Sequence, residues 1–291
     1  MKPADFDYFA PTTRGACLDL LGELADCRVL AGGQSLLPRM SLRLERPRAV
    51  VDLRTVPGLA DRYVGREGAL AIGCMTRQAD LLADAGIAGR HPLLASALSF
   101  VGTVATRNRG TLGGSLAFAD PCAELPAAAA ALGAVVVLDH HGGRRRVAVE
   151  DFVTGPFRTS IGRGELLTSI ELPSPSGRPF GCWDELATLQ LERPYVGVGV
   201  TGWTDESGRV GGARVVTNGW LDRPFLLERA ADALVGRTLD AVHVDVLGAA
   251  IRRDLAGERP ATNLPRANVL VERLTRRIVA GLARDREVAH V

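Results

Sequence analysis

The sequence predicts a globular protein in which short strands and helices are mixed within three successive blocks. Three observations carry this prediction. Apolar runs of four or five residues, typical of buried strands, alternate along the chain with longer segments of helical periodicity. A stretch rich in Pro, Ser and Gly, at 173–179, separates the last block from the other two. The length of 291 residues also exceeds the size at which a single hydrophobic core is usual.

The composition is that of an ordinary soluble globular protein. Apolar residues make up 46% of the chain, charged residues 23%, and the formal net charge is +2. This near balance of charge argues against a dedicated nucleic-acid binder. No apolar run is long enough to span a membrane, and the opening MKPADFDYFAP has no signal segment. We therefore expect a cytoplasmic protein with no membrane span and no nucleic-acid partner.

The first block runs to about residue 58. Residues 13–24 have a helical pattern, 27–30 are typical of a short buried strand, and 49–53 predict a second strand. Between the strands lies AGGQSLLPRM (31–40), whose glycine pair removes every Cβ from the turn. A plain tight turn is the commoner use of such a pair, and the alternative is close approach of backbone N–H groups to a ligand.

The second block runs from 59 to 173. A strand at 69–73 leads into a helix over 76–84, for which Thr76 is the predicted N-cap. A second helix is predicted over 92–101. After a glycine-rich stretch, a third helix is predicted over 122–132.

The second block continues with AVVVL and RRVAVE, which predict a hairpin around the turn at Gly142 and Gly143, and it closes with a strand over 165–173. His140 and His141 fall at the hairpin tip. The five cysteines are scattered, without a C-x-x-C spacing, so neither these histidines nor the cysteines predict a metal site.

The third block runs from 179 to 291. Residues 195–203 and 211–220 flank a turn and predict a hairpin, and apolar residues at three- and four-residue steps predict a helix over 266–284. The first of these strands contains G-x-G-x-x-G, the dinucleotide fingerprint, at Gly197. Because no helix follows it, we interpret this motif as a glycine-containing strand.

A second glycine motif pairs with the first. NRGTLGGS (108–115) has a threonine before a glycine pair, so we predict a second turn that faces the first across a cleft. Each turn would offer N–H donors and polar side chains, from Gln34 and Ser35 on one side and Thr111 and Ser115 on the other. A diphosphate is the natural ligand of such paired turns. Neither motif carries a lysine or a carboxylate cluster, which favours a bound dinucleotide over nucleotide hydrolysis.

Four segments resemble the FAD-binding medium subunits of the molybdenum hydroxylases, the family of xanthine dehydrogenase and aerobic carbon monoxide dehydrogenase. They are AGGQSLLPRMSLRLERPRAVVDL, IGCMTR, TRNRGTLGGSLAFADPCAELPAAAAALGA and GELLTSIELP. The resemblance covers residues 1–173 and extends more faintly beyond them. It implies an α+β, vanillyl-alcohol-oxidase-like (PCMH-type) fold with two FAD-binding subdomains, 1–58 and 59–173, and an α+β C-terminal domain over 179–291.

The resemblance also implies which residues hold FAD. Those expected around the diphosphate are Ala31, Gly32, Gly33, Gln34, Ser35, Thr111, Gly113 and Gly114. Those expected elsewhere on or near the cofactor are Leu36, Leu37, Ser115, Asp120, Leu166 and Tyr195. Asp120 would serve hydroxyl or ring groups of FAD, and Tyr195 would lie beside the isoalloxazine ring. No acidic residue in the matched segments stands out as a general base, so no catalytic residue and no metal ligand is predicted.

The function that the resemblance implies is electron transfer. A large molybdopterin subunit would oxidise the substrate, and a small subunit with two [2Fe–2S] clusters would pass electrons to this FAD. FADH₂ would then reduce an external acceptor, and the complete enzyme would be a heterotrimer, doubled by symmetry. Two alternatives remain at this point. One is a stand-alone FAD-dependent oxidase or dehydrogenase acting on a small molecule, and the other is a binding module for another nucleotide.

Overall fold

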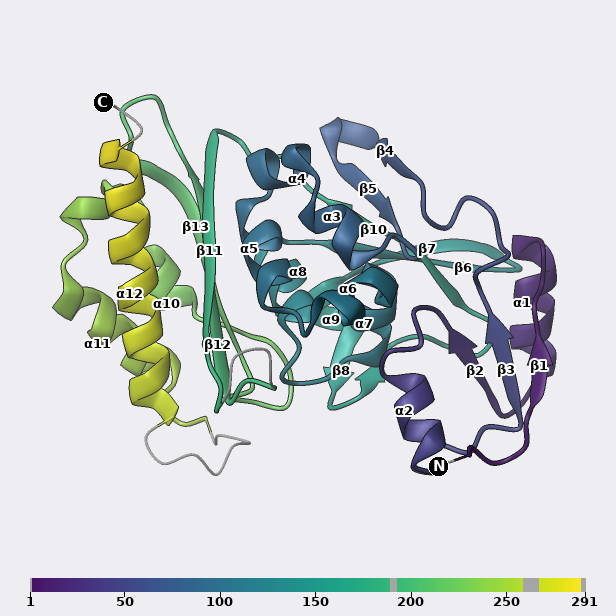
Figure 1. Cartoon of the computed structure of the whole chain (residues 1–291). Helices are drawn as coiled ribbons and strands as arrows, with labels where there is room; N and C mark the ends of the chain where they lie inside the picture. The colour runs from purple at the N-terminus through teal and green to yellow at the C-terminus, as the bar shows by residue number, and fades with distance from the viewer. Residues whose placement is uncertain (1, 189–192, 259–266, 289–291) are drawn as a thin grey trace.

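The computed structural model describes residues 2–188, 193–258 and 267–288, and it mixes helices and strands as predicted. Figure 1 shows a small sheet near the N-terminus, a central part of helices and a second sheet, and a third sheet toward the C-terminus. No helix in the described ranges combines the length and apolar character needed to cross a membrane.

The first sheet is parallel, with strand order β1-β3-β2. Its elements are β1 (Asp7–Phe9), α1 (Arg14–Glu23), β2 (Cys27–Leu30), α2 (Leu36–Ser41) and β3 (Ala49–Asp52). The central strand β3 is buried along its whole length. These bounds confirm the predicted helix and both strands of the first block.

The prediction that 27–30 is a buried strand is wrong in one respect. Strand β2 lies at the edge of the sheet, and the side chains of Arg28 and Val29 are exposed. Both residues line the cleft described below, so this edge strand forms part of a cleft wall.

The second sheet is antiparallel, with strand order β4-β5-β10-β6-β7. Its strands are β4 (Arg62–Val64), β5 (Leu70–Gly73), β6 (Val135–His140), β7 (Gly143–Ala148) and β10 (Leu166–Leu172). The hairpin of β6 and β7, the strand β5 and the strand β10 confirm the predictions for this block.

Helices fill the space between β5 and β6. The elements between β4 and β10 that lie outside this sheet are η1 (Arg66–Gly68), α3 (Gln78–Leu82), α4 (Ala85–Arg90), α5 (Pro92–Phe100), α6 (Val104–Arg109), α7 (Leu112–Phe118), α8 (Glu124–Ala131), α9 (Val149–Phe152), β8 (Val153–Gly155) and β9 (Arg158–Thr159). Thr76 is not the cap of α3, whose N-cap is Arg77. An isolated bridge between Arg77 and Thr111 keeps this segment extended, and the Thr76 hydroxyl instead donates to the carbonyl of Ala60 at 3.1 Å.

The third sheet is antiparallel, with strand order β11-β12-β13-β14. The elements of this part are β11 (Arg178–Leu186), β12 (Val196–Thr204), β13 (Val210–Asn218), β14 (Phe225–Leu226), α10 (Glu228–Asp232), η2 (Leu239–Ala241), α11 (Val244–Asp254) and α12 (Ala267–Val288). The G-x-G-x-x-G motif lies within β12, as interpreted from the sequence. Arg266, the predicted first residue of the last helix, lies outside the described residues.

Both faces of the third sheet are covered by helices. Helices α10 to α12 lie on one side of it and α5 and α8 on the other (Figure 1). Trp183 and Val216 of the sheet pack with Leu93 of α5, and the α8 members of the same buried cluster are Ala127, Ala128 and Ala131. Helix α8 is buried along its whole length, and its alanines belong to the buried clusters of both the second and the third sheet. It therefore packs between the two sheets.

An ion-pair cluster joins α1 to the second sheet. The carboxylate of Asp139, on β6, accepts from Arg14 of α1 at 2.9 Å and from Arg144 of β7 at 2.7 Å. Burial acts to raise the pKa of Asp139, but hydrogen bonds and charge from the two arginines outweigh it, so the pKa lies below its usual value.

We expect Asp139→Asn to lower the free energy of unfolding by about 1–2 kcal/mol at neutral pH, because charged hydrogen bonds are lost while both arginines stay partly solvated. A carboxylate with a lowered folded-state pKa stabilises above its unfolded pKa, and this contribution disappears as the pH falls through the folded pKa. Urea unfolding of both proteins across the acidic range measures this, with exposed Asp151→Asn as the control. If the difference in free energy of unfolding between wild type and variant did not decrease at acidic pH, the lowered pKa assigned to Asp139 would be contradicted.

Candidate functional site

A cleft of about 790 Å³ opens between the loop after β2 and the segments around α6, α7 and α8. Arg193 and Pro194, which precede β12, complete its wall. Most of the residues that the sequence predicts for FAD line it. They are Ala31, Gly32, Gly33, Gln34, Ser35, Leu36, Thr111, Gly113, Gly114, Ser115, Asp120 and Leu166.

The loop over 31–35 is held open by its two glycines. Gly33 has a φ of 74°, which favours glycine, and a Cβ on buried Gly32 would overlap the carbonyl oxygen of Arg109. Within the described part of the chain, the N–H groups of residues 32–35 donate to no other group. This loop therefore presents a run of unused backbone donors at the cleft.

The second glycine pair differs from the prediction, because it lies in the first turn of α7 rather than in a loop. Thr111 caps this helix, and its Oγ1 accepts from the N–H of Gly114 at 3.0 Å. The N–H of Gly113 donates to the carbonyl of Cys74 at 2.9 Å, and the N–H of Ser115 to that of Thr111 at 3.2 Å. The expectation that both motifs offer free N–H donors is therefore wrong for the second motif.

The glycines of α7 serve close packing. A Cβ on Gly113 would overlap the side chain of Cys74, and a Cβ on Gly114 would lie 2.8 Å from Thr111 Oγ1 and 3.4 Å from the Cβ of Ala31. The two glycines thus let α7 lie directly against Cys74, which follows β5, and against the loop over 31–35.

Gln78 is a site residue that sequence reasoning missed. It is 5% exposed, its N–H donates to the carbonyl of Gly110 at 3.0 Å, and it lines the cleft. Its Oε1 has no hydrogen-bond partner within the described residues. Its position depends on the bridge between Arg77 and Thr111, which joins segments far apart in the sequence, so no local signal marked it.

Glu124 is a second missed residue and corrects the expectation that no acidic group stands out. It is the first residue of α8, is 8% exposed and lines the cleft. Burial, together with the nearby carboxylates Glu185 and Asp120, raises its pKa to about 8. Its burial follows from the burial of α8 along its whole length, which the sequence alone does not show.

The rim of the cleft carries aromatic rings and arginines. The rings of Phe118 and Phe157 lie 5.1 Å apart, edge to face, and the guanidinium groups of Arg39 and Arg193 lie 5.5 and 5.9 Å from the Phe157 ring. Arg193 also forms an ion pair with Asp120. The predicted cofactor residue Asp120 is thus held by an arginine that sequence reasoning missed.

Two predicted residues, Leu37 and Tyr195, do not line the cleft. Leu37 is 38% exposed. Tyr195 is 43% exposed, and its hydroxyl lies 2.6 Å from Thr188 Oγ1.

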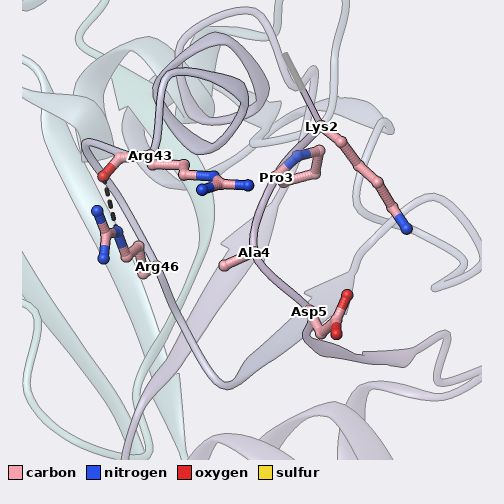
Figure 2. A pocket seen from close by; sticks show the side chains of 6 residues that line it. All are labelled: Lys2, Pro3, Ala4, Asp5, Arg43 and Arg46. Carbon is pink, nitrogen blue, oxygen red and sulfur yellow. Dashed lines mark hydrogen bonds between the residues drawn. The ribbon is translucent and has the colours of Figure 1, made fainter.

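A second depression, of about 390 Å³, lies near the N-terminus. Figure 2 shows its lining, in which the side chains of Lys2, Arg43 and Arg46 surround the backbone of residues 3–5. It contains none of the predicted site residues. Within the described ranges, no three His, Cys, Asp or Glu side chains come together as metal ligands would.

A family model described as FAD binding domain in molybdopterin dehydrogenase matches residues 4–175. The chain belongs to this family. The matched region includes the loop over 31–35, all of α7 and Glu124, and the cleft lies almost entirely within it.

Curated relatives and solved structures agree with the family. The 6-hydroxypseudooxynicotine dehydrogenase complex subunit alpha of Paenarthrobacter nicotinovorans is 33% identical, over 83% of this chain and 81% of the relative. The carbon monoxide dehydrogenase medium chain of Afipia carboxidovorans is also 33% identical, over 84% and 85%. A structure of reconstituted CO dehydrogenase from Oligotropha carboxidovorans matches with a TM-score of 0.89 and 30% identity, over 97% of this chain and 99% of that chain.

The cleft suits the FAD of this family. Its volume lies within the usual range for cofactor sites. The unused N–H groups of the loop over 31–35 are the donors that a diphosphate requires.

We expect Gly32→Ala to weaken FAD binding by tenfold or more, because its Cβ can be accommodated only if the loop over 31–35 moves away from Arg109. Titration of the FAD-free protein with FAD, followed by flavin fluorescence, measures the affinity. Gly89→Ala is the matched control, since a Cβ there meets no atom within 4 Å. Equal affinities for a folded Gly32→Ala protein and the control would mean that this contact does not shape the FAD site.

Proposed function

We propose that this chain is the FAD-carrying electron-transfer subunit of a molybdopterin-dependent hydroxylase or dehydrogenase. The observation that carries the proposal is the coincidence of the family match over residues 4–175 with a cleft that contains both glycine motifs. When bound, FAD supplies the electron chemistry, and the protein supplies binding and orientation.

The residues divide the work of holding FAD. The N–H groups of the loop over 31–35 bind the diphosphate, and the hydroxyl of Ser115 borders the same space. Leu36 and Leu166 provide apolar contact. Glu124 holds a proton at neutral pH, because its carboxyl is buried beside other carboxylates.

The three sheets correspond to the parts of a vanillyl-alcohol-oxidase-like fold. The parallel sheet belongs to a first FAD-binding subdomain over 1–58, the five-stranded sheet to a second over 59–173, and the four-stranded sheet to a C-terminal domain over 179–291. The separation of the C-terminal domain is supported by its own buried cluster, whereas one buried cluster is shared by the first two parts.

The complete enzyme is a heterotrimer, doubled by symmetry. Its large subunit carries molybdopterin, and its small subunit carries two [2Fe–2S] clusters that reduce the FAD of this chain. An external acceptor then takes the electrons. The names of the relatives support this assembly, because they describe a complex subunit and a medium chain.

We expect the full chain to bind FAD more tightly than FMN by on the order of 100-fold, because FMN has no diphosphate to pair with the N–H groups of residues 32–35. Calorimetric titration of the FAD-free chain with each flavin measures the two dissociation constants. Equal affinities for FAD and FMN would contradict the assignment of the diphosphate to the loop over 31–35.

Co-expression with the products of neighbouring genes tests the subunit assignment. We expect two further subunits, one with molybdopterin and one with [2Fe–2S] clusters, to co-purify with this chain, and substrate to reduce its FAD only in that complex. Substrate oxidation by the FAD-loaded chain alone would instead establish a stand-alone flavin oxidase or dehydrogenase.

A further inference from the structure

Helix α2, which follows the loop over 31–35, packs on the first sheet with only part of its surface. Its Met40 is buried and forms a small cluster with Leu30 of β2 and Val50 of β3, against which Leu36 also packs. Leu37, the next residue of the helix, is not part of this cluster. In Figure 1, α2 lies at the outside of the molecule near the N-terminus. The helix therefore has one face in the core and another that no described residue covers.

Three leucines in and just after α2 are exposed. Leu37 is 38% exposed, Leu42 57% and Leu44 65%. Within the described ranges, Leu44 is the most exposed of the large apolar side chains. Single exposed apolar residues are common on protein surfaces, but several on one short segment indicate an interaction site.

The turn that carries two of these leucines has a fixed shape. The N–H of Arg43 donates to the carbonyl of Met40 at 2.9 Å, and the N–H of Leu44 donates to that of Arg39 at 2.8 Å. Arg43 has a φ of 58°, a conformation that favours glycine. The turn thus holds Leu44 in solvent at a cost in backbone strain. A surface that is already ordered loses less entropy when a partner binds to it.

The same segment carries positive charge that is not neutralised. Glu45, the acidic residue of segment 36–48, is already paired with Arg28 at 3.2 Å and with Arg39 at 3.4 Å. Arg43 and Arg46 are exposed, and neither has an ion pair among the residues that the structure describes. The Nε of Arg46 donates to the carbonyl of Arg43 at 3.1 Å, which holds the two residues together.

A third cation lies beside these arginines. Figure 2 shows Lys2 at the depression that Arg43 and Arg46 line, and Asp5, at the same depression, is paired with neither arginine. We call this region the α2 surface. It consists of Lys2, Leu37, Leu42, Arg43, Leu44 and Arg46. The α2 surface combines exposed apolar groups with cations that lack a carboxylate partner, so it fits an acidic protein surface.

Helix α2 separates this surface from the cleft. Leu36 and Arg39 of α2 line the cleft, whereas Leu37 does not. A helix with its side chains is about 10 Å across, so a partner on the α2 surface lies about that far from the cleft. Because electron transfer slows steeply with distance, this position suits a partner that exchanges electrons with a cofactor in the cleft.

We propose that the small subunit with two [2Fe–2S] clusters docks on the α2 surface. The proposal rests on the proposed function. A [2Fe–2S] cluster held by cysteine thiolates is anionic, so its subunit complements Lys2, Arg43 and Arg46. The exposed leucines supply the apolar centre of the interface. A lipid surface is the weaker fit, because the leucines occupy a helix of six residues and a turn rather than one extended helix face.

Two variants of the full chain, each co-expressed with the other two subunits, test the α2 surface. They are the double variant Arg43→Glu/Arg46→Glu and the single variant Leu44→Asp. We expect the iron that co-purifies per FAD to fall by about tenfold or more in each, because like charges face each other or a charge enters the apolar centre. The FAD content per chain should not change.

The controls make the same chemical changes at exposed sites of the third block. They are Arg223→Glu/Arg253→Glu for the charge reversal and Val244→Asp, on a side chain 52% exposed, for the leucine. Both should keep the iron per FAD of the wild type. Deuterium exchange gives a readout that needs no variant, since the amides of residues 42–46 should exchange more slowly in the complex than in the isolated FAD-loaded chain.

The other outcomes separate this proposal from the proposed function. Unchanged iron per FAD in both variants, with unchanged exchange over 42–46, would overturn the docking site and leave the FAD function standing. Loss of the molybdopterin subunit without loss of iron would assign the surface to the large subunit instead. Binding to phosphatidylglycerol vesicles that the variants lose, with iron per FAD unchanged, would assign it to a membrane. A wild-type chain that co-purifies with no iron–sulfur subunit would overturn both proposals.

Discussion

The close approach of Gly32 to the backbone of Arg109 and Gly110 sets the shape of the cleft. A Cβ on Gly32 would overlap the carbonyl oxygen of Arg109 and lie 2.8 Å from the Cα of Gly110. The same segment is held from its other side by Gln78, whose N–H donates to the carbonyl of Gly110. A contact between two backbone segments cannot be relieved by rotation of a side chain, so the distance between the segments cannot change without moving the backbone. The loop with unused N–H groups is therefore held at one fixed distance from α7.

The third sheet influences the cleft mainly by supporting residues of the cleft wall, rather than by lining the cleft itself. It contributes only Arg193 and Pro194 to the lining among the described residues, yet Asn218 and Gly219 bind the carbonyls of Cys122 and Pro121. These bonds, together with the packing of Trp183 against α8, fix the segment that presents Asp120 and Glu124. The position of a buried carboxyl in the cleft thus depends on a sheet that lies outside the matched family region.

The sequence was sufficient to predict both glycine motifs, most strands and the long helices, because these depend on local periodicity and on glycine's lack of a Cβ. It could not show that Gly113 packs against Cys74, since a glycine pair before an apolar run reads equally as a turn or as a first helical turn. The sequence also carried no sign that Gln78 lines the cleft, because its position depends on a bridge between segments that are distant in the sequence. Glu124 was missed because an acidic residue at the start of a helix is common at the protein surface, and its burial follows from the tertiary packing of the whole of α8.

The floor and the rim of the cleft are held by interactions of different strength. The floor consists of close backbone contacts and helix packing, and these contacts are lost only when the protein unfolds. The rim joins all three parts of the chain through Arg39, Phe118, Phe157 and Arg193, and a cation–ring contact at a partly exposed site contributes about 0.5–1 kcal/mol. Phe157 also has a φ of 56°, a conformation that costs about 1–3 kcal/mol in a residue other than glycine. These two contributions oppose each other, so the contacts of the rim add little net stability, and the shape of the cleft depends on the packing of its floor.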